Sequence, residues 1–374
     1  MKTKFVLSSV ALFFASVFAS ADTFFFLASP DGAVVNDMGL WKQLSVNKSG
    51  DNFNFYIFPE GTEGRIESDV PDAGKWSAGV LSSDQSKTVS ADSDVIINRY
   101  YMGELQSDGS VKFGTLVFGD TETIVFTDSF TARDMKIRIN NSVKMDFAPA
   151  EVINLNLSSL DIRQVAHTYV GKTTAGSVNI NIDGDFTVSP PSGQAGCNFD
   201  LGSYDGFIDS VRANNFKMSS VLDIAVTFCV HKADFASTDI RNTYNNAENG
   251  EGRTRLILNV GVLEPLESAI YSLGTAYKNA DDAITVDFGM VNPESLSAGE
   301  YKIVSIDQWS EGFAEGGSLK DFNLSADVFD AYGIEYAFDW DGQNLTLTVV
   351  PEPAMFAALF GAFALMLAAR RGRK

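Results

Sequence analysis

The side chains that could support imidazole catalysis are few, and no serine stands in the sequence context of a catalytic nucleophile. The two histidines, His167 and His231, stand far apart in the chain, and neither belongs to a His-Glu-x-x-His or Cys-x-x-Cys pattern of the kind that binds a metal. Ser203, within 202–206, lies one position away from where a Gly-x-Ser-x-Gly nucleophile elbow needs its serine. We therefore predict no catalytic, metal-ligating or cofactor-binding residue, and we expect that the protein is not an enzyme.

Carboxylates are abundant, with 48 acidic residues against 28 basic ones. Two opposed carboxylates could hydrolyse a glycosidic bond, but a β-rich chain with so many acids brings some within reach by chance, so the sequence selects no pair. Clustered acids can also bind calcium. Asp183-Gly184-Asp185 and the segment 339–342 hold oxygen ligands, yet neither completes an Asp-x-Asp-x-Asp-Gly loop and both suit ordinary turns better. We predict no cofactor, with calcium as the alternative.

The N-terminus has the composition of a secretory signal peptide. Two lysines precede an apolar run over residues 5–18, and the small residues Ala19 and Ala21 occupy the two positions that a signal peptidase reads. We predict cleavage after Ala21, so that the mature chain begins at Asp22. An uncleaved anchor or a buried helix is the alternative, although the run is shorter than the span of about 20 residues that crosses a membrane.

The C-terminal sequence predicts a single transmembrane helix that is followed by cations on its cytoplasmic side. An apolar run over residues 354–369 would cover about 24 Å as a helix, a little less than the hydrocarbon core of a bilayer. Four cations follow the run: Arg370, Arg371, Arg373 and Lys374. By the positive-inside rule these cations stay in the cytoplasm, which places the preceding body on the far side of the membrane and agrees with the signal peptide.

The tripeptide Pro351-Glu352-Pro353 stands directly before this apolar run. The two prolines remove backbone donors and favour an extended chain, so neither a strand nor a helix continues easily through them. A Pro-Glu-Pro element, an apolar helix and an Arg-rich terminus, in this order and with a signal peptide, resemble the PEP-CTERM sorting signal of exosortase substrates. The resemblance covers only the C-terminal end of the chain, from about Val350 to Lys374. The alternative is an ordinary single-span C-terminal anchor.

The resemblance to PEP-CTERM proteins implies a route and a destination for the chain. It implies a Gram-negative bacterium, recognition of the tail by a membrane-embedded exosortase, and cleavage near the Pro-Glu-Pro element. The product would be delivered to the cell surface or the extracellular matrix. Signal peptidase and exosortase would be the partners during maturation, and the membrane would hold the C-terminal helix until processing.

Charge is distributed unevenly along the chain. The net charge is −20, but six of the 28 basic residues lie in the two terminal signals, so the body between Asp22 and Val350 carries −25. Binding to nucleic acid needs a surplus of Lys and Arg on at least one face, so we exclude a nucleic-acid partner. An acidic body instead indicates solubility, contact with cations, or contact with matrix components such as exopolysaccharide.

Cys197 and Cys229 are the only cysteines, and export would permit a disulfide between them. This bond would close a loop of about 33 residues and stabilise the fold by roughly 3–4 kcal/mol in the chain-entropy model. The alternative is a buried free thiol, because Cys229 lies in the apolar run 224–230. We predict the disulfide.

Alternation of apolar and polar residues predicts an all-β body between Asp22 and Val350. The clearest strands are 52–58, 123–126, 135–139, 152–157 and 178–182. Between about 111 and 188 short strands follow one another, with Asn and Asp beside or within several of them. This pattern suits an elongated β-solenoid, but it equally suits a β-sandwich whose antiparallel strands have one face towards water. Both architectures stay open. Helix is predicted near 266–277 and, more weakly, over 293–297.

The end of the body predicts a hairpin, 334–340 with 343–349, joined by a two-residue Asp341-Gly342 turn. Its register pairs Phe338 with Leu345, Tyr336 with Leu347 and Ile334 with Val349, which places the apolar partners on one face. Together with strands at 283–288 and 299–306, this region resembles, more loosely, the closing β-module of PEP-CTERM and autotransporter-like surface proteins.

We therefore divide the chain into a signal peptide (1–21), a β-rich body (22–260), a C-terminal β-module (261–350) and a sorting signal (351–374). The predicted function is that of an exported, non-catalytic surface or matrix protein. The alternative is a secreted carbohydrate-active enzyme or a lectin-like module with the same sorting signal. An enzyme would need a cleft with two convergent acids, flanked by aromatics such as Trp41, Trp76, Trp309 or Trp340.

Overall fold

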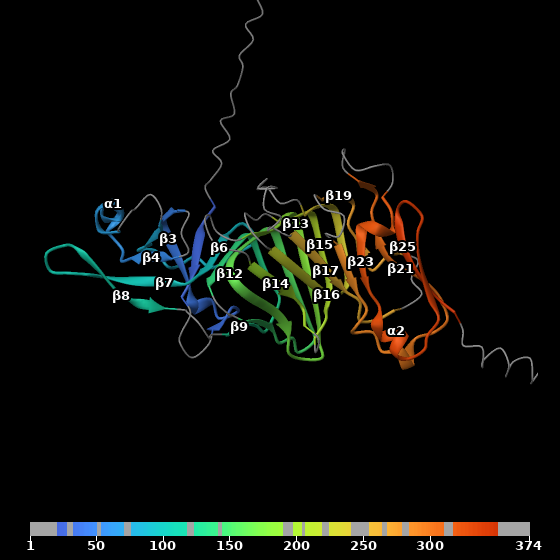
Figure 1. Ribbon diagram of the computed structural model, residues 1–374. Coiled ribbons are helices and arrows are strands. Elements are labelled where there is room, and N and C mark those ends of the chain that lie inside the picture. Colours follow the sequence, from blue (N-terminus) through green and yellow to red (C-terminus); the bar gives the residue numbers. More distant parts are fainter. Residues whose placement is uncertain are drawn as a thin grey trace, which may run out of the picture.

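Figure 1 shows the computed structural model as an elongated molecule built from strands. The structure describes residues 21–27, 33–50, 54–70, 76–117, 123–140, 144–189, 197–203, 206–218, 224–240, 254–263, 268–278, 284–309 and 317–350. The predicted all-β class is confirmed, because helix in these ranges is limited to short turns such as α1 (Ile66–Asp69) and α2 (Asp327–Ala331). No helix in the described ranges is long and apolar enough to cross a membrane.

The N-terminal part is a mixed sheet that closes on itself. Its strands are β1 (Thr23–Phe26), β3 (Trp41–Lys48), β4 (Phe55–Phe58), β5 (Ser77–Leu81), β6 (Asp94–Asn98), β7 (Tyr100–Leu105) and β8 (Val111–Val117). They pair in the order β6–β1–β3–β5–β4–β7, with β8 on the outer edge of β7. β6 begins this order and β7 ends it, and only Arg99 separates the two strands in the sequence. The sheet therefore closes into a ring, which we call the N-terminal ring. Inside this N-terminal ring, Phe25 packs against Phe55 and Tyr100, with ring centroids 4.6 and 5.3 Å away.

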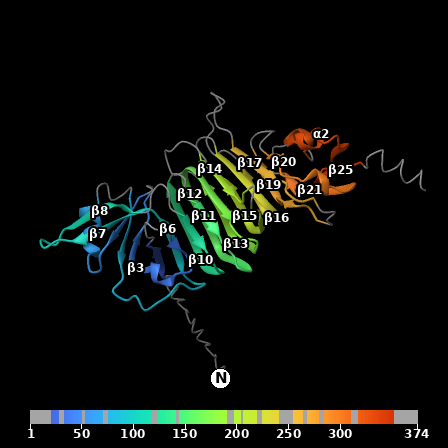
Figure 2. The same ribbon diagram turned by 90° about the horizontal axis from the view of Figure 1, so that it is seen from below.

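Beyond the ring, the chain winds into stacked coils whose strands pair in parallel with those of neighbouring coils, as in a solenoid (Figure 2). One stack, sheet A, contains β6, β10 (Phe130–Asn140), β12 (Val152–Lys172), β13 (Ser177–Ser189), β15 (Ile208–Met218), β16 (Ile224–Ile240), β18 (Tyr271–Ser272), β19 (Thr275–Lys278), β21 (Gly299–Ser305) and β22 (Gln308–Trp309). The other stack, sheet B, contains β2 (Ala33–Val34), β9 (Thr123–Phe126), β11 (Lys144–Phe147), β14 (Cys197–Leu201), β17 (Thr254–Asn259), β20 (Ile284–Asp287) and β23 (Phe322–Ser325). The long strands β12 and β16 belong to both sheets. Parallel pairing continues across residue 260.

Alternation within each coil explains how the coils stack. In β13, Val178, Ile180 and Ile182 are buried, whereas the asparagines between them are only half-buried and lie on the opposite face. Parallel pairing in register then places the inward side chains of successive coils in rows through the core. Phe186 pairs with Phe216 in this way, with ring centroids 5.2 Å apart, and Phe235 of the next coil contacts the Phe216 ring diagonally, also at 5.2 Å.

Sheet A carries one β-bulge, in β13. Between Ile182 and Phe186, β13 has one residue more than the facing stretches of β12 and β15, so the register shifts on both sides of this strand. Further along the stack, Gly274 lies at the same level with a φ of +57°, and a Cβ there would lie 2.1 Å from the carbonyl oxygen of Ala236. Because a β-bulge bends its strand, β13 bends at this level.

Most of the predicted strands are confirmed. The prediction 123–126 coincides with β9, and the predictions 135–139, 152–157 and 178–182 lie within β10, β12 and β13. The prediction 52–58 is represented by β4 in its described part. The weakly predicted helix over 293–297 is a single 3₁₀ turn, Pro293–Ser295, whose first turn is capped by the Asn292 side chain.

The helix predicted over residues 266–277 is wrong in the part that the structure describes. This segment forms β18 and β19, which pair with β16 on one side and with β21 and β22 on the other. Tyr271 and Leu273 are fully buried, and the Tyr271 hydroxyl donates to the carbonyl of Asn259 at 2.6 Å. The positive φ of Gly274 breaks the segment into two short strands. The apolar residues whose spacing suggested a helix therefore lie in the core of a coil.

The predicted C-terminal hairpin is confirmed, but its register differs from the prediction by two residues. Strand β24 (Tyr336–Trp340) pairs antiparallel with β25 (Asn344–Val349), and β25 pairs antiparallel with β21 at the end of sheet A. The observed partners are Trp340 with Leu345, Phe338 with Leu347 and Tyr336 with Val349. Asp341 explains the shift, because its Oδ1 accepts the N–H groups of Gln343 and Asn344 at 2.8 and 2.7 Å and so lengthens the turn. A shift of two residues keeps each side chain on its predicted face.

Candidate functional site

The outer face of sheet A is a regular array of polar side chains. We define this polar face as Thr131, Asn154, Asn156, Asn179, Asn181, Asp185, Ser210, Arg212, Asn215, Lys217 and Ser237. These residues alternate with core residues along their strands, so they point away from the core. Because successive coils pair in register, they lie in rows that run across β10, β12, β13, β15 and β16.

Amide ladders connect the coils along the polar face. The Asn181 Nδ2 donates to Asn156 Oδ1 at 3.0 Å, and in the next row the Asn179 Nδ2 donates to Asn154 Oδ1 at 3.2 Å. Ser210 Oγ continues the second row by donating to Asn179 Oδ1 at 2.7 Å. Each amide carries two donor hydrogens and two acceptor lone pairs, so these ladders leave hydrogen-bonding capacity directed to solvent.

Several charged groups on sheet A form ion pairs with one another. Asp185 accepts a hydrogen bond from Lys217 Nζ at 2.6 Å and another from Asn215 Nδ2 at 2.7 Å, and the contact with Lys217 lowers the pKa of the Asp185 carboxyl. Near the ring, Arg133 donates to both carboxylate oxygens of Asp94 at 2.9 and 2.8 Å, which raises the pKa of Arg133. Asp185 is therefore held ionised by the cation next to it.

The two acid motifs considered for calcium have other contacts. Asp183 is exposed and lies 3.9 Å from Arg212 Nη2, whereas Asp185 contacts Lys217. Asp341 closes the β24–β25 turn, and its hydrogen bonds to Asn344 and Gln343 lower the pKa of its carboxyl. Within the described residues, no group of three or more His, Cys, Asp or Glu side chains is placed to hold a metal ion.

The expected disulfide between Cys197 and Cys229 is not formed, and Cys229 is a free, buried thiol. Cys197 of β14 pairs with Ile224 of β16, and Cys229 lies further along β16 beside Asn259. At about 3.3 Å per residue the two cysteine Cα atoms are about 17 Å apart, well beyond the roughly 7 Å that a disulfide spans. Asn259 Nδ2 donates to Cys229 Sγ at 3.1 Å, and burial raises the pKa of the thiol to about 11.

The other candidate side chains of the sequence have structural neighbours. His231 is exposed and stacks on Phe207 with ring centroids 5.2 Å apart, and the His167 side chain lies outside the described part of the structure. Ser203 forms a backbone bridge with Gly206. The tryptophans pack against other aromatic rings: Trp41 against Phe26, Trp76 against Tyr56, and Trp309 and Trp340 against each other and Phe322.

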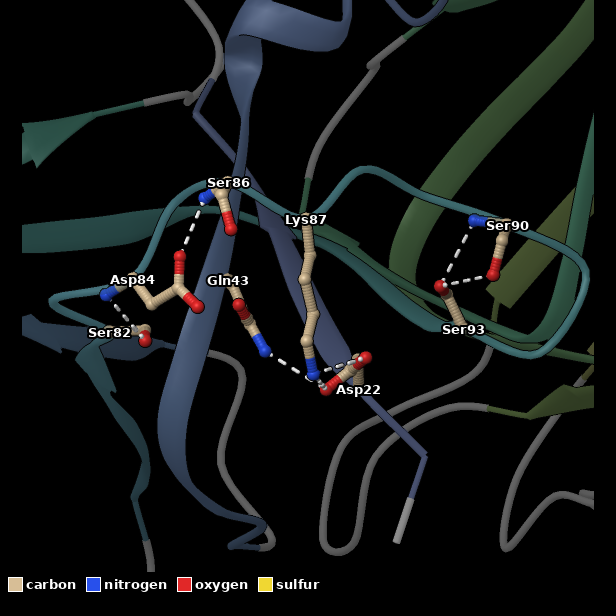
Figure 3. A network of polar contacts seen from close by, with 8 residues as sticks. All are labelled: Asp22, Gln43, Ser82, Asp84, Ser86, Lys87, Ser90 and Ser93. Carbon is tan, nitrogen blue, oxygen red and sulfur yellow. Dashed lines mark hydrogen bonds and ion pairs between the residues drawn. The ribbon is translucent and has the colours of Figure 1, made fainter. Parts of the chain in front are cut away.

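Asp22, the predicted first residue of the mature chain, is held by two neighbouring segments (Figure 3). Lys87 Nζ donates to its two carboxylate oxygens at 2.8 and 3.0 Å, and Gln43 Nε2 of β3 donates to Asp22 Oδ1 at 2.9 Å. The hydrogen bond with Asp22 raises the pKa of Lys87. Since β1 begins at the next residue, the chain is anchored directly after the predicted cleavage position at Ala21.

The residues of the predicted sorting signal lie outside the described residues. These are Pro351, Glu352, Pro353, Arg370, Arg371, Arg373 and Lys374, and Ala19 of the signal peptide also lies outside them. Strand pairing ends at Val349, and the Val350 N–H donates to the carbonyl of Glu335 at 2.9 Å. The hydrogen-bonded body therefore extends to the residue that precedes Pro351 in the sequence.

The sequence contains one direct signal for the polar face, which is a repeated Asn-x-Asn pattern. It occurs at 154–156 and again at 179–181, and these two pairs stack in register on adjacent coils. The asparagines within these strands can be seen in the sequence. Their alignment into rows depends on how strands of neighbouring coils pair, which the sequence of a single strand does not show. No protein-family model, curated protein or solved structure matches this chain.

Proposed function

We propose that the protein is exported and sorted to the cell surface or extracellular matrix, where its β body has a non-catalytic structural or adhesive role. The terminal sequences support the route, since a signal peptide and a tail resembling the PEP-CTERM signal flank the body. The functional part of the proposal rests on the polar face, because it is a continuous array of half-exposed polar side chains on an elongated scaffold. Exosortase and signal peptidase act during maturation.

The polar face suits an extended polysaccharide partner. Rows of amides and hydroxyls on adjacent coils repeat at the spacing of about 4.8 Å between paired strands. Sugar hydroxyls donate and accept hydrogen bonds, and the ladder amides retain both capacities towards solvent. Asp185 is the only acid among the residues that define the polar face, and it is paired with Lys217, so these residues do not present a row of bare carboxylates that would repel an acidic polymer.

The alternative proposal is a carbohydrate-active enzyme or a lectin-like module with the same sorting signal. Such a site would bring two carboxylates together beside exposed aromatic rings. Trp41 and Trp309 are buried, and Trp340 packs against Phe322. These positions favour the non-catalytic role.

The test is incubation of the purified full-length protein with acidic and neutral exopolysaccharides. Co-sedimentation measures retention, and the appearance of new reducing ends measures hydrolysis. We expect retention without new reducing ends. Replacing Asn156→Ala and Asn181→Ala together should weaken retention by about tenfold, because each substitution removes a hydrogen-bonding side chain from the same row.

Asn323→Ala provides the matched control, since Asn323 is an exposed asparagine on β23 of sheet B. This variant should retain polysaccharide as the unaltered chain does. Release of reducing ends would favour the enzyme, and an equal loss of retention in the control variant would remove the polar face as the binding surface.

A further inference from the structure

Two rows of the polar face lie side by side on sheet A and contain no charged residue. We call them row 1, which runs through β10, β12 and β13, and row 2, which runs through β12, β13 and β15. In-register pairing defines their members, which are Thr131, Asn156 and Asn181 for row 1, and Asn154, Asn179 and Ser210 for row 2. Members of the two rows on one strand are two residues apart, so the rows run about 7 Å from each other.

The asparagines of both rows are hydrogen-bonded in the same direction. In row 1, Asn181 Nδ2 donates to Asn156 Oδ1 at 3.0 Å, and Asn156 Nδ2 lies 3.5 Å from Thr131 Oγ1. In row 2, Asn179 Nδ2 donates to Asn154 Oδ1 at 3.2 Å. Each of these amides keeps at least one N–H and one lone pair for a ligand. The same donor and acceptor therefore recur at each coil, about 4.8 Å apart.

Charge lies beyond these rows rather than within them. Arg212 pairs in register with Asn181, one coil past row 1, and lies 3.9 Å from Asp183. Lys232 pairs in register with Ser210, one coil past row 2. An acidic chain laid on the rows would gain no ion pair from their members, and the net charge of −25 on the body would repel it. The two rows therefore favour an uncharged ligand.

The rows offer a continuous path across the strands but not along them. Along β13, the regular outward positions end at the bulge between Ile182 and Phe186. Across the strands, partners on neighbouring coils are about 4.8 Å apart, which is closer than the roughly 7 Å between outward side chains along one strand. Figure 2 shows β12, β13 and β15 side by side along the length of the molecule. A ligand that follows the rows therefore runs parallel to the long axis of the coils.

We propose that rows 1 and 2 together bind one uncharged, extended polysaccharide chain that crosses the coils, with about one sugar ring for each coil. An extended β-1,4-linked chain is a flat ribbon that carries hydroxyl groups on both edges, so one edge can contact row 1 while the other contacts row 2. Each sugar hydroxyl both donates and accepts a hydrogen bond, which matches the free N–H and lone pair of the amides. This inference rests on the proposed function, because it takes a polysaccharide as the partner, and it adds the class of the chain and its direction.

The composition of the rows sets how affinity depends on chain length. Neither row contains an aromatic side chain, so each sugar is held by hydrogen bonds alone and adds about fivefold to the affinity. Together the rows cover β10, β12, β13 and β15. Affinity should therefore rise with each sugar up to about a tetrasaccharide and change little beyond it.

The test is calorimetric titration of the full-length chain with β-1,4-linked glucose oligosaccharides, from the disaccharide to the hexasaccharide. Two double variants check the direction of the bound chain: Asn154→Ala with Asn156→Ala on β12, and Asn179→Ala with Asn181→Ala on β13. Each should weaken binding of the tetrasaccharide by about tenfold or more, and to a similar extent, because a chain that crosses the coils contacts both strands.

Three controls isolate the rows, the shape of the ligand and its charge. Asn323→Ala, on β23 of sheet B, should bind as the unaltered chain does. The α-1,4-linked glucose oligosaccharides have the same sugars but a curved chain, so they should bind much more weakly at equal length. Affinity for the β-1,4-linked tetrasaccharide should be the same at low and high ionic strength, because no charge pairs with the ligand.

The proposal is overturned if affinity does not increase with chain length, if only one of the two double variants weakens binding, or if the curved chain binds equally well. Retention of acidic polysaccharide on the polar face without binding of the β-1,4-linked chains would also overturn it, but would leave the proposed surface role standing. If no polysaccharide of either kind is retained, both this inference and the adhesive part of the proposed function fail.

Discussion

At the scale of single residues, Cys229 shows how the core controls ionisation. Burial raises the pKa of this thiol from its ordinary 9.0 to about 11. An unfolded chain releases the thiol proton first, so the stability linked to Cys229 is fully present below pH 9.0 and is lost as the pH rises through about 11. The full loss linked to this one thiol is roughly 3 kcal/mol.

The measurement is the free energy of unfolding in denaturant at about pH 8 and about pH 11, for the unaltered chain and for Cys229→Ala. The unaltered chain should lose roughly 2 kcal/mol more than the variant over this interval, because the folded thiol is only half ionised at its upper end. Identical pH dependence in the two chains would show that Cys229 does not titrate as a buried thiol.

Single residues also show where sequence reasoning reaches its limit. The sequence identified Cys229 as a member of an apolar run, and that alternative describes its burial correctly. The pairing of Cys197 with Ile224 excludes the disulfide, and this register is set by the stacking of β14 on β16 rather than by either strand alone. For the same reason the sequence does not show that Asn98 and Arg138 are neighbours, because they meet only through the pairing of β6 with β10.

At the scale of elements, the stacking of sheet A depends on glycine where two coils approach closely. Gly274 and Gly333 both have positive φ, at +57° and +67°. A Cβ at Gly274 would lie 2.1 Å from Ala236 O, whereas a Cβ at Gly333 would meet nothing within 4 Å. Gly333→Ala should therefore cost about 1 kcal/mol for backbone conformation alone. Gly274→Ala should cost at least about 2 kcal/mol more, because β19 and β16 must also separate.

Denaturant unfolding of both variants checks this difference, and Gly333→Ala is the matched control for the shared backbone cost. Equal losses in the two variants would mean that the coils relax freely at Gly274, so its close approach to Ala236 would not constrain the stack.

Element type was predictable wherever alternation was strong, and less so where two patterns overlapped. Strands β9, β12 and β13 alternate cleanly and were located from sequence. The segment that contains Tyr271 and Leu273 has apolar residues that suit either a helix face or two short strands, and the contacts with β16 decide between them. The C-terminal hairpin was found with its faces correct, but the Asp341 side chain changed its register through hydrogen bonds that the Asp-Gly pattern does not specify.

At the scale of the whole molecule, irregular coil length explains why the sequence could not choose between a solenoid and a sandwich. Val152 pairs with Ser177, whereas Ala233 pairs with Tyr271, so the chain follows a much longer path between the second pair than between the first. No fixed period therefore appears in the sequence, although the strands stack in parallel throughout the described coils. Stacking produces the polar face, which is a property of the assembled coils and not of any one of them.

Charge is also a property that separates the parts of the whole chain. The net charge of −20 combines two basic terminal segments with a body at −25. If both signals are removed during maturation, the acidic body alone meets the surroundings of the cell. This separation makes the location of the chain the central claim to test.

The most direct test compares the full-length chain with one that lacks residues 354–374 in a Gram-negative host with an exosortase. Surface exposure is measured by accessibility to added protease in intact cells, and processing is measured by intact mass. The full-length chain should be cleaved near Pro351-Glu352-Pro353 and reach the surface, whereas the truncated chain should stay unprocessed in the periplasm. Surface exposure of the truncated chain equal to that of the full-length chain would contradict sorting through the tail.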